Sequence, residues 1–222
     1  RDGNRGSCVQ CCRWVYEIRE KNKGGEFLPV EEDERGTYIF NSKDLNLIDY
    51  LDEVKKSGAV SLKIEGRMKS EYYLATVVNA YRRAIDRYEA CGADYKNDKV
   101  FDEEVAKTAH RAFTTAYTLG NNDSTVNYSD SQSRGERTFA AFVLGSGSDE
   151  NGNYVLVEMR NRFKVGEKLE VLSPSDSFNE IIEVSRMTDD ESGAEITDAK
   201  LVQQKIRIYT DVKLSHGDIL RK

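Results

Sequence analysis

No apolar run in this 222-residue sequence approaches the eighteen or so residues that are needed to cross a bilayer. A positively charged segment followed by an apolar one, which would mark a secretory signal, is also missing. Charged residues make up 32% of the chain and the mean hydropathy is -0.66. The composition therefore predicts a soluble protein with no membrane partner.

Cysteine is scarce, and its placement is uneven. The four cysteines are Cys8, Cys11, Cys12 and Cys91, so three of them crowd into five residues. A secreted disulfide framework spreads its cysteines, and this pattern instead predicts a reducing, cytoplasmic setting. The formal net charge of -6 gives no overall positive field for nucleic acid, so any contact with RNA is expected to be local.

Peptidase motifs are absent as well. The sequence contains neither HExxH nor GxSxG, and its only histidines are His110 and His216. A peptidase needs a nucleophile with a base, or a hydrated metal with its ligands. With two histidines, these residues offer few possibilities for a catalytic pair of a serine or cysteine nucleophile and a histidine base.

Hydrophobic periodicity divides the first 120 residues into alternating elements. Apolar and polar residues alternate over 13–40, which indicates strands, and Gly58 stands where the C-cap of the next helix is expected. The elements expected after that are a helix over 42–58, a strand over 59–64, and helices over 70–90 and 99–118. This order is typical of a parallel α/β layer.

The composition changes after Gly120. Residues 121–136 are rich in Asn, Ser and Asp and are expected to form a linker. Short apolar runs separated by turn residues follow, at 139–144, 154–157, 169–172, 181–184 and 206–209. They predict a small antiparallel β-barrel or sandwich over 137–222, and hence an α+β protein.

Five segments carry a family resemblance. In chain order they are "RDGNRGSCVQCCRW", "EEDERGTYIFNSKDL", "KIEGRMKSEYYLATVVNAYRRAID", "HRAFTTAY" and "MRNRFKVGEKLEVLSP". Together they resemble the collagenase-like proteins of peptidase family U-32. The resemblance implies that residues 1–120 are the C-terminal portion of a (β/α) barrel-type domain and that 137–222 form its small β-barrel. The chain would then be the C-terminal half of such a protein.

The family carries two functional labels. One branch is known as iron–sulfur factors for the hydroxylation of tRNA, ribosomal RNA or ubiquinone, and early members were described as collagenases. The leading expectation is an enzyme for tRNA uridine hydroxylation, with this piece inactive alone. The alternatives are a collagenase-like peptidase that acts on collagen or peptides, and a stand-alone binding or lid module.

The resemblance assigns a cofactor to two of the cysteines. Cys8, Cys12 and Arg13 match the family's C-x-x-x-C-R element, whose thiolates are cluster ligands in the hydroxylation branch. Thiolates are soft donors that suit iron–sulfur clusters. A [4Fe–4S] cluster needs four ligands, so two more are expected upstream. Cys11 departs from the family pattern and is a spare thiol, an alternative ligand or an inert buried residue.

The segment "KIEGRMKS" supplies the candidate catalytic residues Glu65, Arg67 and Lys69. They follow the C-terminal end of a predicted strand, where barrels of alternating strands and helices keep their reactive groups. Arg67 can bind a carboxylate or phosphate through two parallel hydrogen bonds, and Lys69 can add a point charge. Glu65 can form an ion pair with the arginine or act as a general acid or base. The alternative is an ion-pair cluster that seals the rim of the barrel.

Three further residues are candidates for substrate binding. His110 lies in the family-like segment "HRAFTTAY", where packing within a helix is the alternative role. Arg160 and Arg162, with Lys164, form a basic patch beside Phe163. RNA-contacting surfaces combine cations with aromatic rings in this way, and the alternative is a hairpin with ordinary surface charge.

Overall fold

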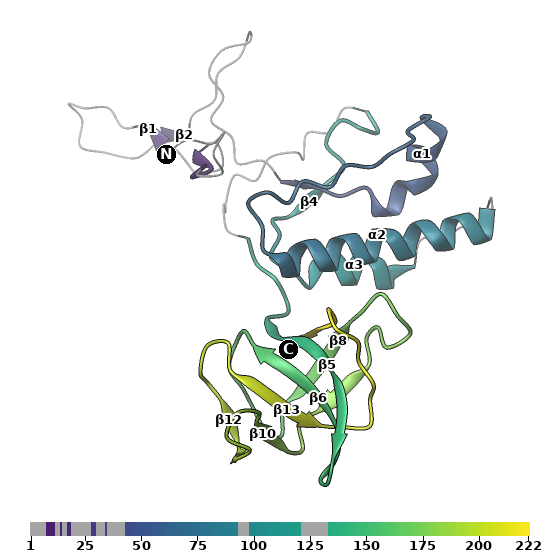
Figure 1. Cartoon of the computed structure of the whole chain (residues 1–222). Coiled ribbons are helices and arrows are strands. Elements are labelled where there is room, and N and C mark those ends of the chain that lie inside the picture. Colours follow the sequence, from purple (N-terminus) through teal and green to yellow (C-terminus); the bar gives the residue numbers. More distant parts are fainter. Residues whose placement is uncertain are drawn as a thin grey trace. The chain divides into compact units, whose positions relative to one another are not determined.

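The structure is a computed structural model, and it describes residues 8–11, 14, 17–18, 28–29, 34, 43–92, 98–120 and 133–222. Its packing divides the chain into two units (Figure 1). Unit 1 comprises Arg1–Ser70 and Ala84–Arg134, and unit 2 comprises Glu71–Arg83 and Gly135–Lys222. Helices and strands both occur, so the mixed class predicted from the sequence is confirmed.

In the described part of unit 1 there are two short strand pairs and several helices. One pair is antiparallel and lies within 13–40, where strands were predicted, and the other pair is parallel. The strands are β1 (Glu17–Ile18) with β2 (Leu28–Pro29), and β3 (Asp44–Leu45) with β4 (Phe113–Thr114). The helices are η3 (Ile48–Tyr50), α1 (Leu51–Lys56), α3 (Lys99–Ala106) and the second part of α2 (Glu71–Cys91).

Helix α2 confirms the helix predicted over 70–90, because its apolar residues recur at helical spacing. The helix predicted over 42–58 is shorter, since residues 44–45 pair as β3 and only η3 and α1 are helical. Gly58 follows that helix with a φ of 84°, the left-handed conformation that a glycine C-cap provides. Within the described ranges, no helix combines the length and the apolar character that a bilayer span requires.

The strand predicted over 59–64 is not formed. Residues 59–66 have no regular secondary structure, and no described residue forms a strand ladder with them. Val60 is 100% exposed and Leu62 is 42% exposed, so neither is buried in a sheet. An alternating pattern makes a strand only where a neighbouring strand satisfies its backbone groups.

The helix predicted over 99–118 ends after two turns, at Ala106. Asp98 caps its start by accepting a hydrogen bond from the amide of Val100 at 3.2 Å. Beyond the helix, His110 exchanges backbone hydrogen bonds with Arg134, and residues 113–114 pair with β3. The backbone groups of residues 110 and 113–114 therefore form hydrogen bonds with other segments of the chain, and they are not available for the hydrogen bonds of a longer helix.

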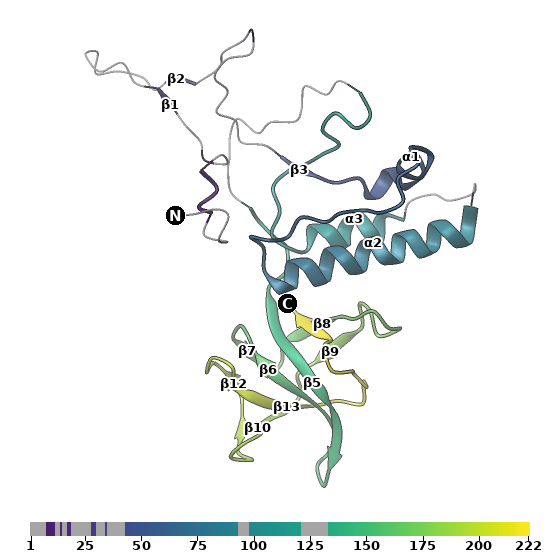
Figure 2. The ribbon, with the colours of Figure 1, turned by 45° about the horizontal axis from the view of Figure 1, so that its top comes forward.

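Unit 2 is built on an eight-stranded antiparallel sheet with the order β11-β10-β13-β6-β5-β14-β8-β9. The five apolar runs identified in the sequence form five of its strands, of which β5 and β6 are the longest (Figure 2). These strands are β5 (Phe139–Asp149), β6 (Gly152–Met159), β8 (Lys168–Leu172), β9 (Ile181–Glu183) and β13 (Lys205–Tyr209).

The other strands of unit 2 were not predicted from the sequence. Each has only two or three residues, which is too short for a period of two to be seen. They are β7 (Phe163–Lys164), β10 (Met187–Asp189), β11 (Glu195–Ile196), β12 (Asp198–Ala199) and β14 (Ile219–Arg221). Strands β7 and β12 form a separate two-stranded sheet.

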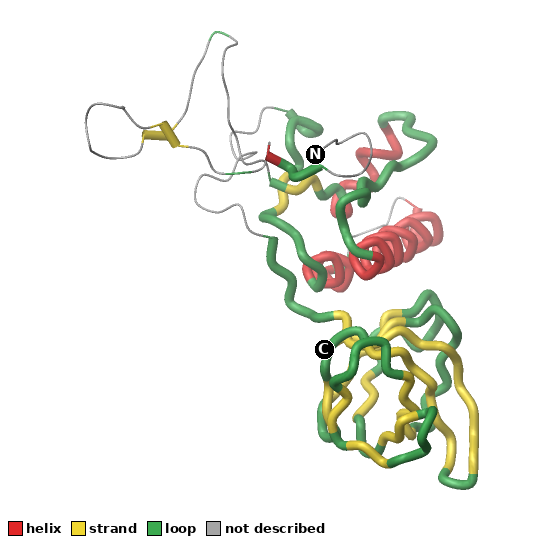
Figure 3. The backbone as a smooth tube through the Cα atoms, turned by 60° about the vertical axis from the view of Figure 1, so that its left-hand side comes forward, coloured by secondary structure: helices red, strands yellow, loops and turns green. Residues whose placement is uncertain are grey.

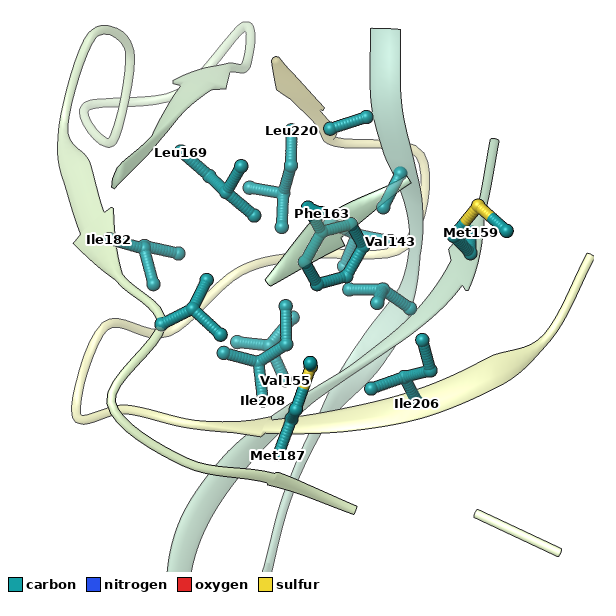
Figure 4. Packing of buried hydrophobic residues seen from close by; sticks show 14 of the residues in the cluster. Val143, Val155, Met159, Phe163, Leu169, Ile182, Met187, Ile206, Ile208 and Leu220 are labelled. Carbon is teal, nitrogen blue, oxygen red and sulfur yellow. The ribbon is translucent and has the colours of Figure 1, made fainter. Parts of the chain in front are cut away.

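The strands of unit 2 curve around a common interior (Figure 3), which apolar side chains fill (Figure 4). Alternation decides which side chains enter it: Val155 and Val157 of β6 are buried, and so are Ile206 and Ile208 of β13. Burying a side chain of this size stabilises the fold by about 1.5–3 kcal/mol. This core therefore provides most of the unit's stability.

A buried ion pair joins two neighbouring strands of this sheet. Arg221 of β14 is fully buried opposite Glu170 of β8, and its Nε and Nη2 atoms donate to Glu170 Oε1 at 3.0 and 2.6 Å. Arg221 Nη2 also donates to Asn179 Oδ1 at 2.9 Å. The charges are buried as a hydrogen-bonded pair, as burial requires.

The first part of α2 packs with the sheet inside unit 2. The ring of Tyr72 stacks on Phe139 with 5.8 Å between the ring centroids. Arg83 Nη2 donates to the carbonyl oxygens of Ser173 and Ser175 at 3.0 and 2.6 Å. The helix that follows "KIEGRMKS" thus begins as part of the C-terminal unit.

The carboxylate of Asp189, the last residue of β10, is expected to make unit 2 sensitive to acid. Hydrogen bonds from Gln204 and Ser192 hold the pKa of Asp189 at about 2. Because the folded state lowers this pKa, the carboxylate stabilises the fold above pH 4, and that contribution is lost as the pH falls from 4 towards 2. We expect Asp189→Asn to lower the melting temperature at pH 7 and to reduce its further fall between pH 4 and pH 2.5.

Thermal unfolding followed by circular dichroism at pH 7, 4 and 2.5 measures this effect. Asp176→Asn, which changes an exposed carboxylate in the 173–180 loop, is the matched control and should track the parent chain. Parallel pH profiles for the parent and Asp189→Asn would contradict the assignment.

Candidate functional site

The segment "KIEGRMKS" forms a tight turn just before α2. Glu65 Oε1 accepts a hydrogen bond from the amide of Arg67 at 2.9 Å, and the carbonyl of Gly66 accepts one from the amide of Lys69, also at 2.9 Å. The side chains of Glu65 and Arg67 are exposed. Glu65 therefore fixes the backbone of the turn that presents Arg67.

Lys69 turns away from the surface, unlike Arg67. Its Nζ atom donates to the carbonyl of Ala109 at 2.9 Å and lies 3.8 Å from Asp44 Oδ2. Only 21% of the side chain is exposed. Of the three residues predicted to line a site, Lys69 thus acts in the structure as a link between distant segments of unit 1.

Asp44 and Arg111 form the centre of this charged cluster. The Arg111 side chain is 2% exposed, and its Nε and Nη2 atoms both donate to Asp44 Oδ1, the former at 3.2 Å. The backbone amide of Arg111 donates to Asp44 Oδ2 at 3.0 Å. Lys69 and Arg111 therefore both contact this one carboxylate.

Asp44 and Arg111 were not among the site residues predicted from the sequence. Both lie in family-like segments, "EEDERGTYIFNSKDL" and "HRAFTTAY", which is the one signal that pointed to them. Asp44 is the first residue of β3, and Arg111 lies two residues before β4. The parallel pairing of these strands brings the two charges together from 67 residues apart.

His110 is held next to this cluster. Its ring stacks on Phe113 with 4.1 Å between the ring centroids and an interplanar angle of 11°. Its Nδ1 atom lies 2.7 Å from the carbonyl oxygen of Arg111. A carbonyl only accepts, so Nδ1 carries the proton and donates it. The imidazole therefore has a fixed orientation and tautomer.

The thiol segment is described only in part. Cys8 and Cys11 are exposed, and the amide of Gln10 donates to Cys8 Sγ at 3.3 Å. Amide hydrogen bonds to sulfur are a feature of iron–sulfur sites, so the exposed Cys8 thiol fits such a group in its chemistry. Cys12 lies outside the described residues. In the parts of the chain that the structure describes, no three His, Cys, Asp or Glu residues gather as a metal site.

Arg160 in unit 2 is tied to its neighbours. It lies 3.2 Å from Glu158 and 3.4 Å from Glu71, the first residue of α2. Its guanidinium also lies over the ring of Phe139, 5.6 Å from the centroid. Arg160 therefore forms ion pairs with β6 and with the start of α2.

Arg162 forms a two-pronged ion pair with Asp198. Its Nε and Nη2 atoms donate to the two carboxylate oxygens at 2.9 and 2.6 Å. These hydrogen bonds raise the pKa of Arg162 and lower the pKa of Asp198. Both groups are therefore charged at neutral pH.

Two family models match the chain in succession. Peptidase family U32 matches residues 1–128, and the Peptidase family U32 C-terminal domain matches residues 136–221. The chain belongs to peptidase family U32, as the motifs in its sequence indicate.

The chain is similar to relatives in this family that have different names, and three of them follow. The chain is 35% identical to tRNA hydroxylation protein P1 of Bacillus subtilis, over all of this chain and 52% of that protein. It is 31% identical to tRNA hydroxylation protein P of Escherichia coli, over 82% of this chain and 48% of that protein. It is also 34% identical to a collagenase of Porphyromonas gingivalis, over 53% of this chain and 27% of that protein. The chain spans about half the length of the first two relatives.

Proposed function

We propose that this chain is part of an iron–sulfur factor for the hydroxylation of tRNA, acting on a uridine. The observation that carries the proposal is the similarity to tRNA hydroxylation protein P1, which runs through every residue of this chain. The similarity to the collagenase covers only 53% of the chain. A peptidase is the second candidate, and the sequence contains neither of the peptidase motifs HExxH and GxSxG.

In this proposal Cys8 and Cys12 hold part of a [4Fe–4S] cluster. The family-like spacing of the two thiols and the amide hydrogen bond to Cys8 Sγ support the assignment. Such a cluster supplies one-electron chemistry when it is bound. The chain contributes thiolate donors and a hydrogen bond that stabilises the charge on sulfur.

The turn at residues 65–69 binds the anionic part of the substrate. Arg67 is exposed on a turn that Glu65 holds, so its guanidinium fork can take two oxygens of one phosphate. Lys69 and the Asp44–Arg111 pair anchor the base of this turn. His110 lies beside the same cluster and is the proposed partner for a further substrate group.

The architecture proposed for the complete protein follows the family resemblance. Residues 1–120 would form part of a (β/α) barrel-type domain, 121–136 a linker, and 137–222 a small β-barrel. The curved antiparallel sheet of unit 2 supports the last of these assignments. A tRNA substrate implies that the protein works in the cytoplasm.

Arg67→Lys tests the substrate-binding role. An ammonium keeps the charge and loses the two-pronged geometry. Losing one charge-assisted contact of about 1.5–3 kcal/mol should lower turnover roughly ten- to a hundredfold. Mass spectrometry of nucleosides from cells that carry the variant in the complete gene product measures the loss. Lys63→Arg, at an exposed position four residues earlier, is the control and should leave the nucleosides unchanged.

A gelatin digestion assay on the same variants separates the two candidate functions. Normal nucleoside hydroxylation with abolished gelatin cleavage would favour the peptidase. A large fall in the melting temperature of Arg67→Lys would instead show that Arg67 has a structural role.

A further inference from the structure

The two-stranded sheet of unit 2 carries a compact array of charged side chains. Strands β7 and β12 pair antiparallel, with Asp198 opposite Lys164 and Ala199 opposite Phe163. Phe163 and Ala199 are fully buried. Because neighbouring residues on a strand point to opposite faces, the residues on either side of them lie on the outer face. That face carries the charge array, which is Arg162, Lys164, Asp198 and Lys200.

The charge array has a surplus of positive charge. Asp198 is paired with Arg162, and the nearby lysines Lys164 and Lys200 lower the pKa of Asp198 further. Three cations therefore surround one carboxylate. Next to the array, Lys222 is paired with Glu167 at 2.9 Å and adds no net charge. Residues 137–222 hold 12 Lys and Arg against 15 Asp and Glu, so the positive surplus is local.

The array is accessible. The Arg162 side chain is 59% exposed, and Lys164 and Lys200 are exposed. Arg160, by contrast, lies between Glu158 and Glu71. The array is thus a better site for an external anion than the Arg160 end of the basic patch predicted from the sequence.

We propose that Arg162, Lys164 and Lys200 bind the phosphate backbone of RNA, and that Asp198 limits the affinity by competing for Arg162. The guanidinium fork suits a phosphate, and the two lysines add point charges on the same face. Contacts of this kind position a nucleic acid without reading its sequence. The charge array follows from the pairing of β7 with β12 and from the contacts between Arg162 and Asp198, and the choice of RNA as the polyanion rests on the proposed function.

The test measures binding of fluorescently labelled bulk bacterial tRNA to the full chain between 50 and 200 mM KCl. Lys164→Gln with Lys200→Gln should weaken binding about ten- to a hundredfold and lower the slope of log K against log salt by roughly 1–2. Asp198→Asn should strengthen binding about three- to tenfold, because it removes the competing anion. Lys213→Gln, at an exposed lysine outside the array, is the control and should stay within about twofold of the parent.

A second pair of substitutions separates RNA from an acidic amphipathic peptide. Leu201 and Val202, which follow the array, are 61% and 85% exposed and would serve such a peptide. If a labelled acidic amphipathic peptide binds the full chain more tightly than tRNA does, and Leu201→Ser with Val202→Ser weakens that binding, the RNA assignment is overturned. If tRNA binding is unchanged in the double lysine variant, the charge array does not bind RNA, and the proposed function is unaffected. If the complete gene product binds tRNA normally but forms no hydroxylated nucleoside, the proposed function is overturned and the charge array remains an RNA-binding site.

Discussion

Asp44→Ala is expected to destabilise unit 1 by about 3–5 kcal/mol, the cost typical of removing one partner from a buried ion pair. The substitution would remove the Asp44 carboxylate from the buried guanidinium of Arg111 and take away the acceptor for the Arg111 amide. Lys69 would lose the same anion. Hydrogen exchange followed by mass spectrometry should show lost protection in peptides that cover 99–114.

Two further variants make this prediction specific. Arg111→Ala should cost a similar amount, and the double variant should cost less than the sum of the two by about 1–3 kcal/mol, because both remove one interaction. Glu53→Ala, at an exposed carboxylate of α1, is the control and should change stability by less than about 0.5 kcal/mol. Additive losses would show that the contact between Asp44 and Arg111 contributes little.

Cys8→Ser is expected to remove most of the iron, and the charge-transfer absorbance, from the complete gene product purified without oxygen. A serine hydroxyl is a hard donor that stays protonated at neutral pH, so it replaces a thiolate poorly on an iron–sulfur cluster. Cys12→Ser should have the same effect, and nucleoside hydroxylation in cells should fall with both. Iron analysis and absorbance spectra measure the loss.

The other cysteines provide the comparison. Cys91→Ser, at the exposed C-terminal end of α2, should retain the iron and the colour. Cys11 is exposed, which contradicts the inert buried role. Cys11→Ser separates the remaining two roles, since only a ligand would change the iron content. Stoichiometric zinc without iron in the parent protein would reject the cluster.

The two units contribute differently to the proposed activity. Unit 1 contains the turn with Arg67 and the charged cluster beneath it, and unit 2 contains the charge array together with the first part of α2. In this proposal the array supplies phosphate contacts that are independent of sequence, while selection of the uridine falls to unit 1. Losing the array should therefore weaken tRNA binding more than it changes which nucleoside is modified.

Local pattern in the sequence was enough to determine α2, the end of the preceding helix at Gly58 and five strands of unit 2. In each case the signal is a periodicity within one segment, because burial on one face repeats along that segment. The predictions that failed depend on distant partners. Residues 59–64 alternate as a strand does and have no neighbouring strand among the described residues, and the helix from Lys99 stops because β4 pairs with β3.

The candidate site follows the same division. The sequence indicated Glu65, Arg67 and Lys69 by composition and resemblance, and only the tertiary structure distinguished the exposed Arg67 from the anchored Lys69. Ion pairs such as Asp44 with Arg111 and Arg162 with Asp198 join residues 67 and 36 positions apart. No local pattern specifies such pairs, because the attraction between two charges depends on their separation in space and their burial, and folding alone sets both.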